Sequence, residues 1–382
     1  MINRSKACLT LLVFVCLMCG CWDRKELNDQ LFDLAGGIDL DESNGNRYLI
    51  TGQLFVPKSG EGQDPPRSAS FLESSRGKNI ADAIDNMQQY LSRSMTRGHR
   101  RNLFIGEKLA RSGISELLDS YTRDPNSRLR TDIWVVKEGT AQDIMKINYP
   151  LEKLSAMAPI KIHQAAGGEV GTSLVHYLMA SKGEGSSPTL PVVKKFSSPG
   201  LDKPTIMFYG RAIFNHKHKL LGYLNYDEAH NRGWIMGTIK NALITTDYQG
   251  TVTGFVSQPK SRIYSAVSNS GYVKVEITIK GKIVLKENNS SLVLSEGTDL
   301  MKLQQSFNNE IKTQMLNLIH KVQKEYKADV LGIGEAVYRQ HPSYWKNHRG
   351  KWDNIFVHSE IIIRPKLEIK QIGQQNSPLH VK

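Results

Sequence analysis

Cysteine is almost absent from this chain. The 382 residues include four cysteines, and all of them lie in the opening segment that ends at Cys21. Everything after Cys21 therefore lacks the means to form a disulfide or a thiolate metal site. If the chain is cleaved just before Cys21 and that thiol carries lipid, no free cysteine remains.

Long apolar runs are missing as well. A membrane-spanning helix needs about 20 apolar residues, and no stretch after residue 20 provides them. The one apolar run, from Ala7 to Met18, is interrupted only by Thr10 and is too short to span a bilayer. Arg4 and Lys6 precede it, and a basic start followed by a short apolar run is typical of a secretory signal.

The end of this run predicts a lipid anchor. Met18-Cys19-Gly20-Cys21 is similar to the bacterial lipobox, in which a small residue precedes the cysteine that receives diacylglycerol. We expect residues 1–20 to be removed and Cys21 to carry acyl chains such as palmitate. Each buried methylene contributes about 0.8 kcal/mol, so several chains anchor a protein stably. The alternative is an ordinary cleaved signal followed by a free thiol.

Recognisable catalytic motifs are lacking too. The sequence has no G-x-S-x-G elbow, no H-E-x-x-H pair and no Walker loop. His216 and His218 flank a single residue, as some metal ligands do, but no third histidine or carboxylate follows at a fixed spacing. We therefore predict no catalytic residue, no cofactor and no metal, and we expect a protein of binding or assembly rather than an enzyme. A cell-wall hydrolase stays open as a rival.

Basic residues are in excess, with 50 lysines and arginines against 37 acidic residues. For an anchored protein the anionic membrane surface is a natural partner for this charge. Export and the lack of a zinc-finger or RNP pattern argue against nucleic acid. The densest basic cluster is Arg97-Gly98-His99-Arg100-Arg101. It is interpreted either as a contact for phospholipid or an acidic partner, or as a solvated turn.

Hydrophobic periodicity predicts an α+β protein of several domains, with mixed or antiparallel sheets each packed with helices. In the first half, Asp23 and Glu26 resemble a capping box opening a helix that carries Leu27, Leu31 and Leu34. Helices and strands then alternate. In the second half, strands precede a long helix from about residue 299 to 326, and a further strand is expected over 355–364.

Composition also predicts the domain boundaries. A signal peptide over 1–20 precedes an N-terminal α+β domain over 21–195, formed as one unit or as two lobes. Residues 196–206 are rich in Ser, Pro and Gly and are interpreted as an interdomain linker. A C-terminal α+β domain is expected over 207–371, followed by a flexible tail over 372–382.

Several stretches together resemble one family, the GerAC-like lipoproteins, which are the C subunits of nutrient germinant receptors in endospore-forming bacteria. The segment Cys21-Trp22-Asp23-Arg24-Lys25-Glu26-Leu27-Asn28 resembles the signature at their mature start. Gly98–Glu107, Gly210–Phe214 and Asp329–Glu335 resemble further family segments, in the same order. The residues around Arg232-Gly233-Trp234 depart from the usual spacing.

The resemblance implies a non-catalytic receptor subunit that acts in spore germination. Such a protein is held by lipid on the outer face of the spore inner membrane, beside two integral-membrane subunits of the A and B types. The resemblance also marks candidate interaction residues: Trp22, Asp23, Glu26, Leu27, Gly98, His99, Arg100 and Arg101. The alternative function is a substrate-binding lipoprotein of a membrane importer, whose usual two α/β lobes fit this chain less well.

Overall fold

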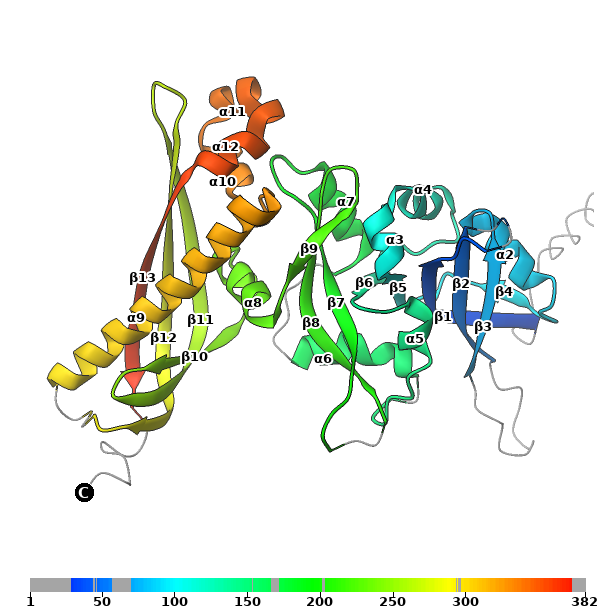
Figure 1. Cartoon of the computed structure of the whole chain (residues 1–382), viewed down its shortest axis with the longest axis horizontal. Coiled ribbons are helices and arrows are strands. Elements are labelled where there is room, and N and C mark those ends of the chain that lie inside the picture. Colours follow the sequence, from blue (N-terminus) through cyan, green and yellow to red (C-terminus); the bar gives the residue numbers. More distant parts are fainter. Residues whose placement is uncertain are drawn as a thin grey trace, which may run out of the picture.

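The computed structural model of the chain describes residues 29–43, 45, 47–56, 70–152, 154–165, 172–200, 203–292, 294 and 297–372. The lipobox and the signature residues Trp22, Asp23, Glu26 and Leu27 lie outside this part of the chain. The described residues form two sheets, each with its own helices, which follow one another along an elongated molecule (Figure 1).

The first sheet is mixed. Its order is β3-β2-β1-β5-β6-β7-β8-β9, with β4 paired to the start of β1. The central pairs β1–β5, β5–β6 and β6–β7 are parallel, whereas the outer pairs are antiparallel. The strands are β1 (Gln30–Leu40), β2 (Tyr48–Phe55), β3 (Ser70–Gly77), β4 (Ser94–Thr96), β5 (Asn102–Gly106), β6 (Asp132–Val136), β7 (Thr189–Phe196), β8 (Thr205–Phe214) and β9 (Leu220–Leu224).

Helices cover both faces of this sheet, as parallel strands require. Alternate residues of the central strands point to opposite faces. Leu103 and Ile133 join one buried cluster with α2, α3, α4 and α7, whereas Phe104 and Trp134 join another with α5. The helices are α2 (Ile80–Gln88), α3 (Glu107–Ser112), α4 (Ser115–Arg123), α5 (Ala141–Met145), η2 (Ser155–Met157), α6 (Ala158–Ala165) and α7 (Leu174–Lys182).

The second sheet has the order β10-β11-β12-β13. The long helix α9 crosses one of its faces and continues into a π-helical turn, η3 (Figure 1). The elements are α8 (Tyr226–Ile235), β10 (Asn241–Asp247), β11 (Gly250–Val267), β12 (Val273–Ser290), α9 (Gly297–His320), η3 (Lys321–Tyr326), α10 (Ile333–Gln340), α11 (Pro342–His348), η4 (Arg349–Lys351), α12 (Trp352–His358) and β13 (Glu360–Gln371).

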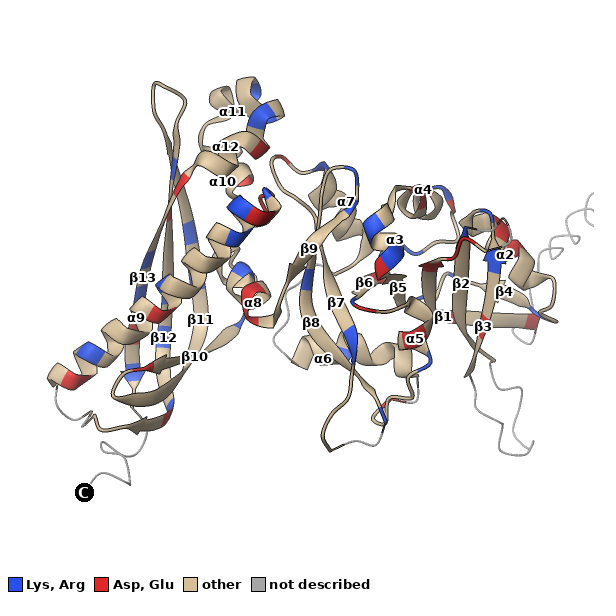
Figure 2. Ribbon diagram, in the orientation of Figure 1, with Lys and Arg blue, Asp and Glu red and all other residues tan. Residues whose placement is uncertain are grey.

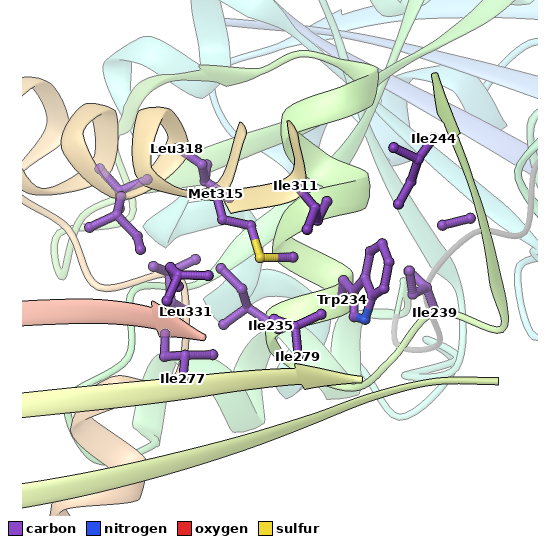
Figure 3. Packing of buried hydrophobic residues seen from close by; sticks show 14 of the residues in the cluster. Trp234, Ile235, Ile239, Ile244, Ile277, Ile279, Ile311, Met315, Leu318 and Leu331 are labelled. Atoms are coloured by element: carbon purple, nitrogen blue, oxygen red, sulfur yellow. The ribbon is translucent and has the colours of Figure 1, made fainter. Parts of the chain in front are cut away.

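One buried cluster holds this second half together. Trp234 of α8 packs in the same cluster as Ile277 and Ile279 of β12, and Ile311 and Met315 of α9 lie on the helix side of it (Figure 3). All five side chains are almost completely buried. The buried apolar residues of α9 therefore face the sheet.

The predicted fold class, α+β with mixed and antiparallel sheets packed with helices, is confirmed. Two predicted elements differ. The helix expected to carry Leu31 and Leu34 is absent from the described residues 30–34, which belong to strand β1. Pairing with β2, β4 and β5 on its two edges overrides the helical spacing of these leucines. The strand expected from residue 355 begins at Glu360, because residues 352–358 form α12.

The segment interpreted as an interdomain linker has a different place in the structure. It joins β7 to β8, which are antiparallel neighbours in the first sheet, with Phe196 paired to Thr205. The first sheet continues through β9, and the chain leaves it after Leu224, where α8 begins. Ser, Pro and Gly are as typical of a turn between two strands as of a linker.

Candidate functional site

The basic cluster at residues 97–101 contains a buried ion pair. The Arg100 side chain turns inward, and its guanidinium donates hydrogen bonds to the Asp33 carboxylate of β1 and to the Tyr121 hydroxyl of α4. Burial raises the pKa of Asp33, and the neighbouring charge of Arg100 opposes that rise. Burial lowers the pKa of Arg100, but its interactions with Asp33 and Tyr121 outweigh this effect and raise the pKa, so the guanidinium stays charged.

A glycine makes room for this pair. A Cβ atom built on Gly36 would lie 2.8 Å from the guanidinium carbon of Arg100, so a larger residue on β1 would displace the arginine. Oδ1 of Asp33 and Nε of Arg100 have no hydrogen-bond partner within the described part of the chain. A buried polar atom without a partner lowers the stability of the fold. Loss of the ion pair would leave still more atoms of Asp33 and Arg100 without a partner, so the pair is structurally important.

The other members of the cluster have separate surroundings. Arg97 forms an ion pair with Asp124 at 2.7 Å. The exposed ring of His99 packs edge-on against Phe32, with centroids 5.1 Å apart. Gly98 is exposed, with open space around it. The exposed Arg101 has no ion pair to any described residue, although its backbone N–H donates to Leu34. Of the two predicted arginines, only Arg101 is therefore placed to meet a partner.

A groove of about 920 Å³ lies beside this cluster, between α2 and α4. Its volume is typical of a small-molecule or side-chain pocket. Four carboxylates and two arginines line the groove, together with apolar side chains such as those of Ile80, Ile84 and Met95. The lining residues are Tyr48, Asn79, Ile80, Ala81, Ile84, Asp85, Gln88, Met95, Arg97, Ser115, Glu116, Asp119, Ser120, Arg123 and Asp124. Sequence reasoning missed this groove, because distant segments supply its lining and no motif connects them.

Two buried aspartates hold the starts of helices. Asp39, at the end of β1, accepts hydrogen bonds from the first backbone N–H groups of α5, those of Ala141 at 2.7 Å and Gln142 at 3.0 Å. Asp329 accepts from the N–H of Gly334 at 2.6 Å, near the start of α10. A carboxylate at a helix N-terminus satisfies otherwise unpaired N–H groups. Burial nevertheless raises the pKa of both carboxyls to about 6.

The Asp329 turn also joins the two halves of the molecule. The backbone carbonyl of Asp329 accepts a hydrogen bond from the N–H of Ser187 at 2.7 Å, in the connection between α7 and β7. In the same connection, Glu184 accepts a hydrogen bond from the indole of Trp345 at 2.6 Å. A Cβ on Gly334 would lie 2.6 Å from the carbonyl oxygen of Gly185. This junction depends on close backbone contact between two glycines.

The two spaced histidines face different partners. His216 lies 3.2 Å from Asp353, which raises its pKa by hydrogen bonding. His218 lies 3.1 Å from the Tyr177 hydroxyl, and burial lowers its pKa. Within the described ranges, no three His, Cys, Asp or Glu side chains are grouped closely enough to hold a metal ion. The two histidines therefore lie in a turn that contacts Tyr177 in the first half of the molecule and Asp353 in the second.

Comparison with known proteins gives a consistent result along the chain. Residues 23–195 match the model of the spore germination protein N-terminal domain, and residues 209–373 match the C-terminal domain described as spore germination B3/GerAC like. Spore germination protein B3 of Bacillus subtilis (strain 168) is 26% identical over 90% of this chain and 91% of its own length. Spore germination protein KC of the same strain is 24% identical over 99% of this chain and 98% of its own.

A solved structure shares the fold. It is described as the crystal structure of the GerBC protein, and it matches with a TM-score of 0.57 and 24% sequence identity. The match covers 88% of this chain and 98% of the solved one. Two family models that together span most of the chain, along with relatives of similar length, confirm the predicted resemblance. The chain belongs to the GerAC-like family of spore germination proteins.

Proposed function

We propose that this protein is the C subunit of a nutrient germinant receptor, held by acylated Cys21 on the outer face of the spore inner membrane. In this role it acts without catalysis, beside integral-membrane subunits of the A and B types, to trigger germination. The observation that carries the proposal is the match of both family domains, in order and over nearly the whole chain. The relatives are themselves named as spore germination proteins.

The lipobox supports attachment through Cys21. Among the helices that the structure describes, none is long and apolar enough to cross a membrane. Eight residues separate Cys21 from Gln30, where β1 begins. Even fully extended, that length of chain reaches only about 30 Å. An acylated Cys21 would therefore keep the start of the first sheet close to the bilayer surface.

Four of the buried charged groups have structural partners, as a role in assembly would allow. Arg100 and Asp33 are paired with each other, and Asp39 and Asp329 bind helix N-termini. Each of these groups thus has a structural partner that accounts for its burial. Two domains, over 21–195 and 207–371, remain our proposal for the units of the chain. The break between the family models, from residue 195 to 209, supports it, although β8 and β9 complete the first sheet.

Substitution of Cys21 tests the proposal. Spores carrying Cys21→Ala should lose the protein from the membrane fraction and respond more weakly to the nutrient of that receptor. Labelled palmitate should enter the unsubstituted chain and be absent from the variant. Cys19→Ala is the matched control, and it should leave labelling and fractionation unchanged. A Cys21→Ala chain that stays in the membrane fraction and supports full germination would refute the proposed anchor.

A further inference from the structure

The second sheet carries a row of three lysines. In the register of its strands, Lys260 of β11 lies opposite Lys280 of β12, and Lys280 lies opposite Lys366 of β13. Residues paired directly across neighbouring strands point to the same face of a sheet. All three lysines are exposed. They lie on the face away from α9, because the residues of β12 that pack with α9 are Ile277, Ile279 and their alternates.

The neighbouring rows add to this charge. On one side of the lysine row, Thr278 of β12 lies between Arg262 of β11 and Arg364 of β13. On the other side of the row, Lys282 lies opposite Glu368. Figure 2 shows basic segments on the strands of this sheet. Residues 274–282 of β12 and their paired residues on β11 and β13 place seven cations and three carboxylates on this face. The cations are Lys260, Arg262, Lys274, Lys280, Lys282, Arg364 and Lys366, and the carboxylates are Glu276, Glu360 and Glu368.

The carboxylates offset the lysine row only in part, because Glu368 interacts with the charges of Lys282 and Lys280 but forms its ion pair with Lys370. Glu276 pairs with Arg364 at 2.7 Å, Glu360 with Lys274 at 3.1 Å and Glu368 with Lys370 at 2.6 Å. Five cations of the face have no ion pair to any residue that the structure describes. These are Lys260, Arg262, Lys280, Lys282 and Lys366.

Repulsion between neighbouring lysines of this row lowers the stability of the sheet when no partner is bound. Neighbouring strands lie about 4.8 Å apart, and like charges directly opposite each other destabilise a sheet. The core of this domain lies on the other face, so the lysines are not part of it. Function is one reason why proteins keep an arrangement that costs stability.

We propose that this lysine row is a docking surface for an acidic segment of another protein. Three observations favour a protein over a lipid surface. Carboxylates lie among the cations. Tyr264 of β11 and Ile362 of β13 lie opposite Glu276 of β12 and add apolar contact area to the same face. The second sheet also lies at the opposite end of the molecule from the start of β1, where the proposed lipid tether would enter (Figure 1).

Binding of a fluorescent deca-glutamate peptide to the mature chain in detergent tests the proposal, with fluorescence anisotropy as the readout. The variant Lys260→Gln/Lys280→Gln/Lys366→Gln should bind about tenfold more weakly, a change of about 1.4 kcal/mol. The matched control removes the same charge from three exposed lysines of the same half that have no ion pair among the described residues. It is Lys312→Gln/Lys346→Gln/Lys351→Gln, and it should bind as the original chain does.

Two further measurements complete the test. Replacing the three row lysines with arginine should preserve binding, and the glutamine variant should keep its circular dichroism spectrum with a melting temperature at least as high as the original. Equal losses in the row variant and the control would overturn the proposal, because they would reflect overall charge. The proposal also fails if the row variant loses binding to vesicles of phosphatidylglycerol and phosphatidylcholine while still binding the peptide. These outcomes do not depend on whether Cys21 is acylated.

Discussion

Replacing Arg100 with methionine gives the sharpest test of how the first sheet is held together. Methionine keeps much of the length of the side chain and removes the charge. The Asp33 carboxylate, 1% exposed, would then be buried without its cation. Breaking a buried ion pair from one side costs about 3–5 kcal/mol. The Tyr121 hydroxyl would lose its partner as well, at a cost of about 1 kcal/mol.

This loss is large beside the stability of a typical domain, which is about 5–15 kcal/mol. Urea unfolding, followed by the fluorescence of tryptophans such as the buried Trp134, measures it. We expect Arg100→Met to lower the free energy of unfolding by about 4 kcal/mol. The neighbouring Arg101→Met is the matched control. Its side chain is exposed, so the change should stay within about 0.5 kcal/mol.

A double variant separates the ion pair from simple packing. If Asp33→Asn accompanies Arg100→Met, no charge is left buried, and much of the lost stability should return. The two substitutions should therefore be non-additive by about 1–3 kcal/mol. A loss below about 1 kcal/mol for Arg100→Met, or strict additivity in the double variant, would refute the structural role of Arg100.

Three other predictions concern a buried carboxyl, a crowded glycine and an exposed lysine in the row. Because the folded-state pKa of Asp329 is raised from 3.8 to about 6, its contribution to stability is full below pH 4 and is lost as the pH rises through 6. Urea unfolding at each pH gives the difference in free energy of unfolding between the original chain and Asp329→Asn. This difference should shrink by up to about 3 kcal/mol from pH 4 to pH 7. A difference that grows with pH would contradict the prediction. Gly334→Ala, which brings a Cβ within 2.6 Å of the carbonyl oxygen of Gly185, should lower stability by about 1–3 kcal/mol in thermal unfolding. Gly350→Ala, with open space around it, is the control, and equal effects of the two would disprove the crowding. Lys280→Gln should raise the free energy of unfolding by about 0.2–1 kcal/mol, a gain that high salt should reduce; no gain at low salt would mean that the row is not repulsive.

The sequence predicted best those elements whose local pattern and tertiary environment agree. The long helix expected from about residue 299 to 326 is present as α9 and η3, and the buried apolar residues of α9 face the second sheet. Prediction failed where pairing between distant strands, rather than the local sequence, determined the structure. The leucines near residue 31 repeat at helical spacing, yet strands on both edges of β1 hold this segment extended. The segment 196–206 has the composition of a linker, and only the pairing of Phe196 with Thr205 shows that it connects two neighbouring strands of one sheet.

The candidate sites show the same limit. The basic cluster was visible in the sequence, but nothing local distinguishes the buried Arg100 from the exposed Arg101. That distinction depends on Asp33, 67 positions away in the chain. The groove and the lysine row are also assembled from distant segments. The alignment of Lys260 and Lys366 with Lys280 follows only from the register of the strands.

Affinity purification from detergent-solubilised spore membranes tests the proposed receptor role most directly. A tag at the C-terminus of the chain leaves Cys21 free for acylation, and mass spectrometry identifies what co-purifies. The proposal predicts two multispanning membrane proteins in constant ratio to the chain, with Cys21→Ala lowering their recovery. Recovery of the chain alone, or together with the permease and ATPase of an importer, would contradict the assignment as a germinant-receptor subunit.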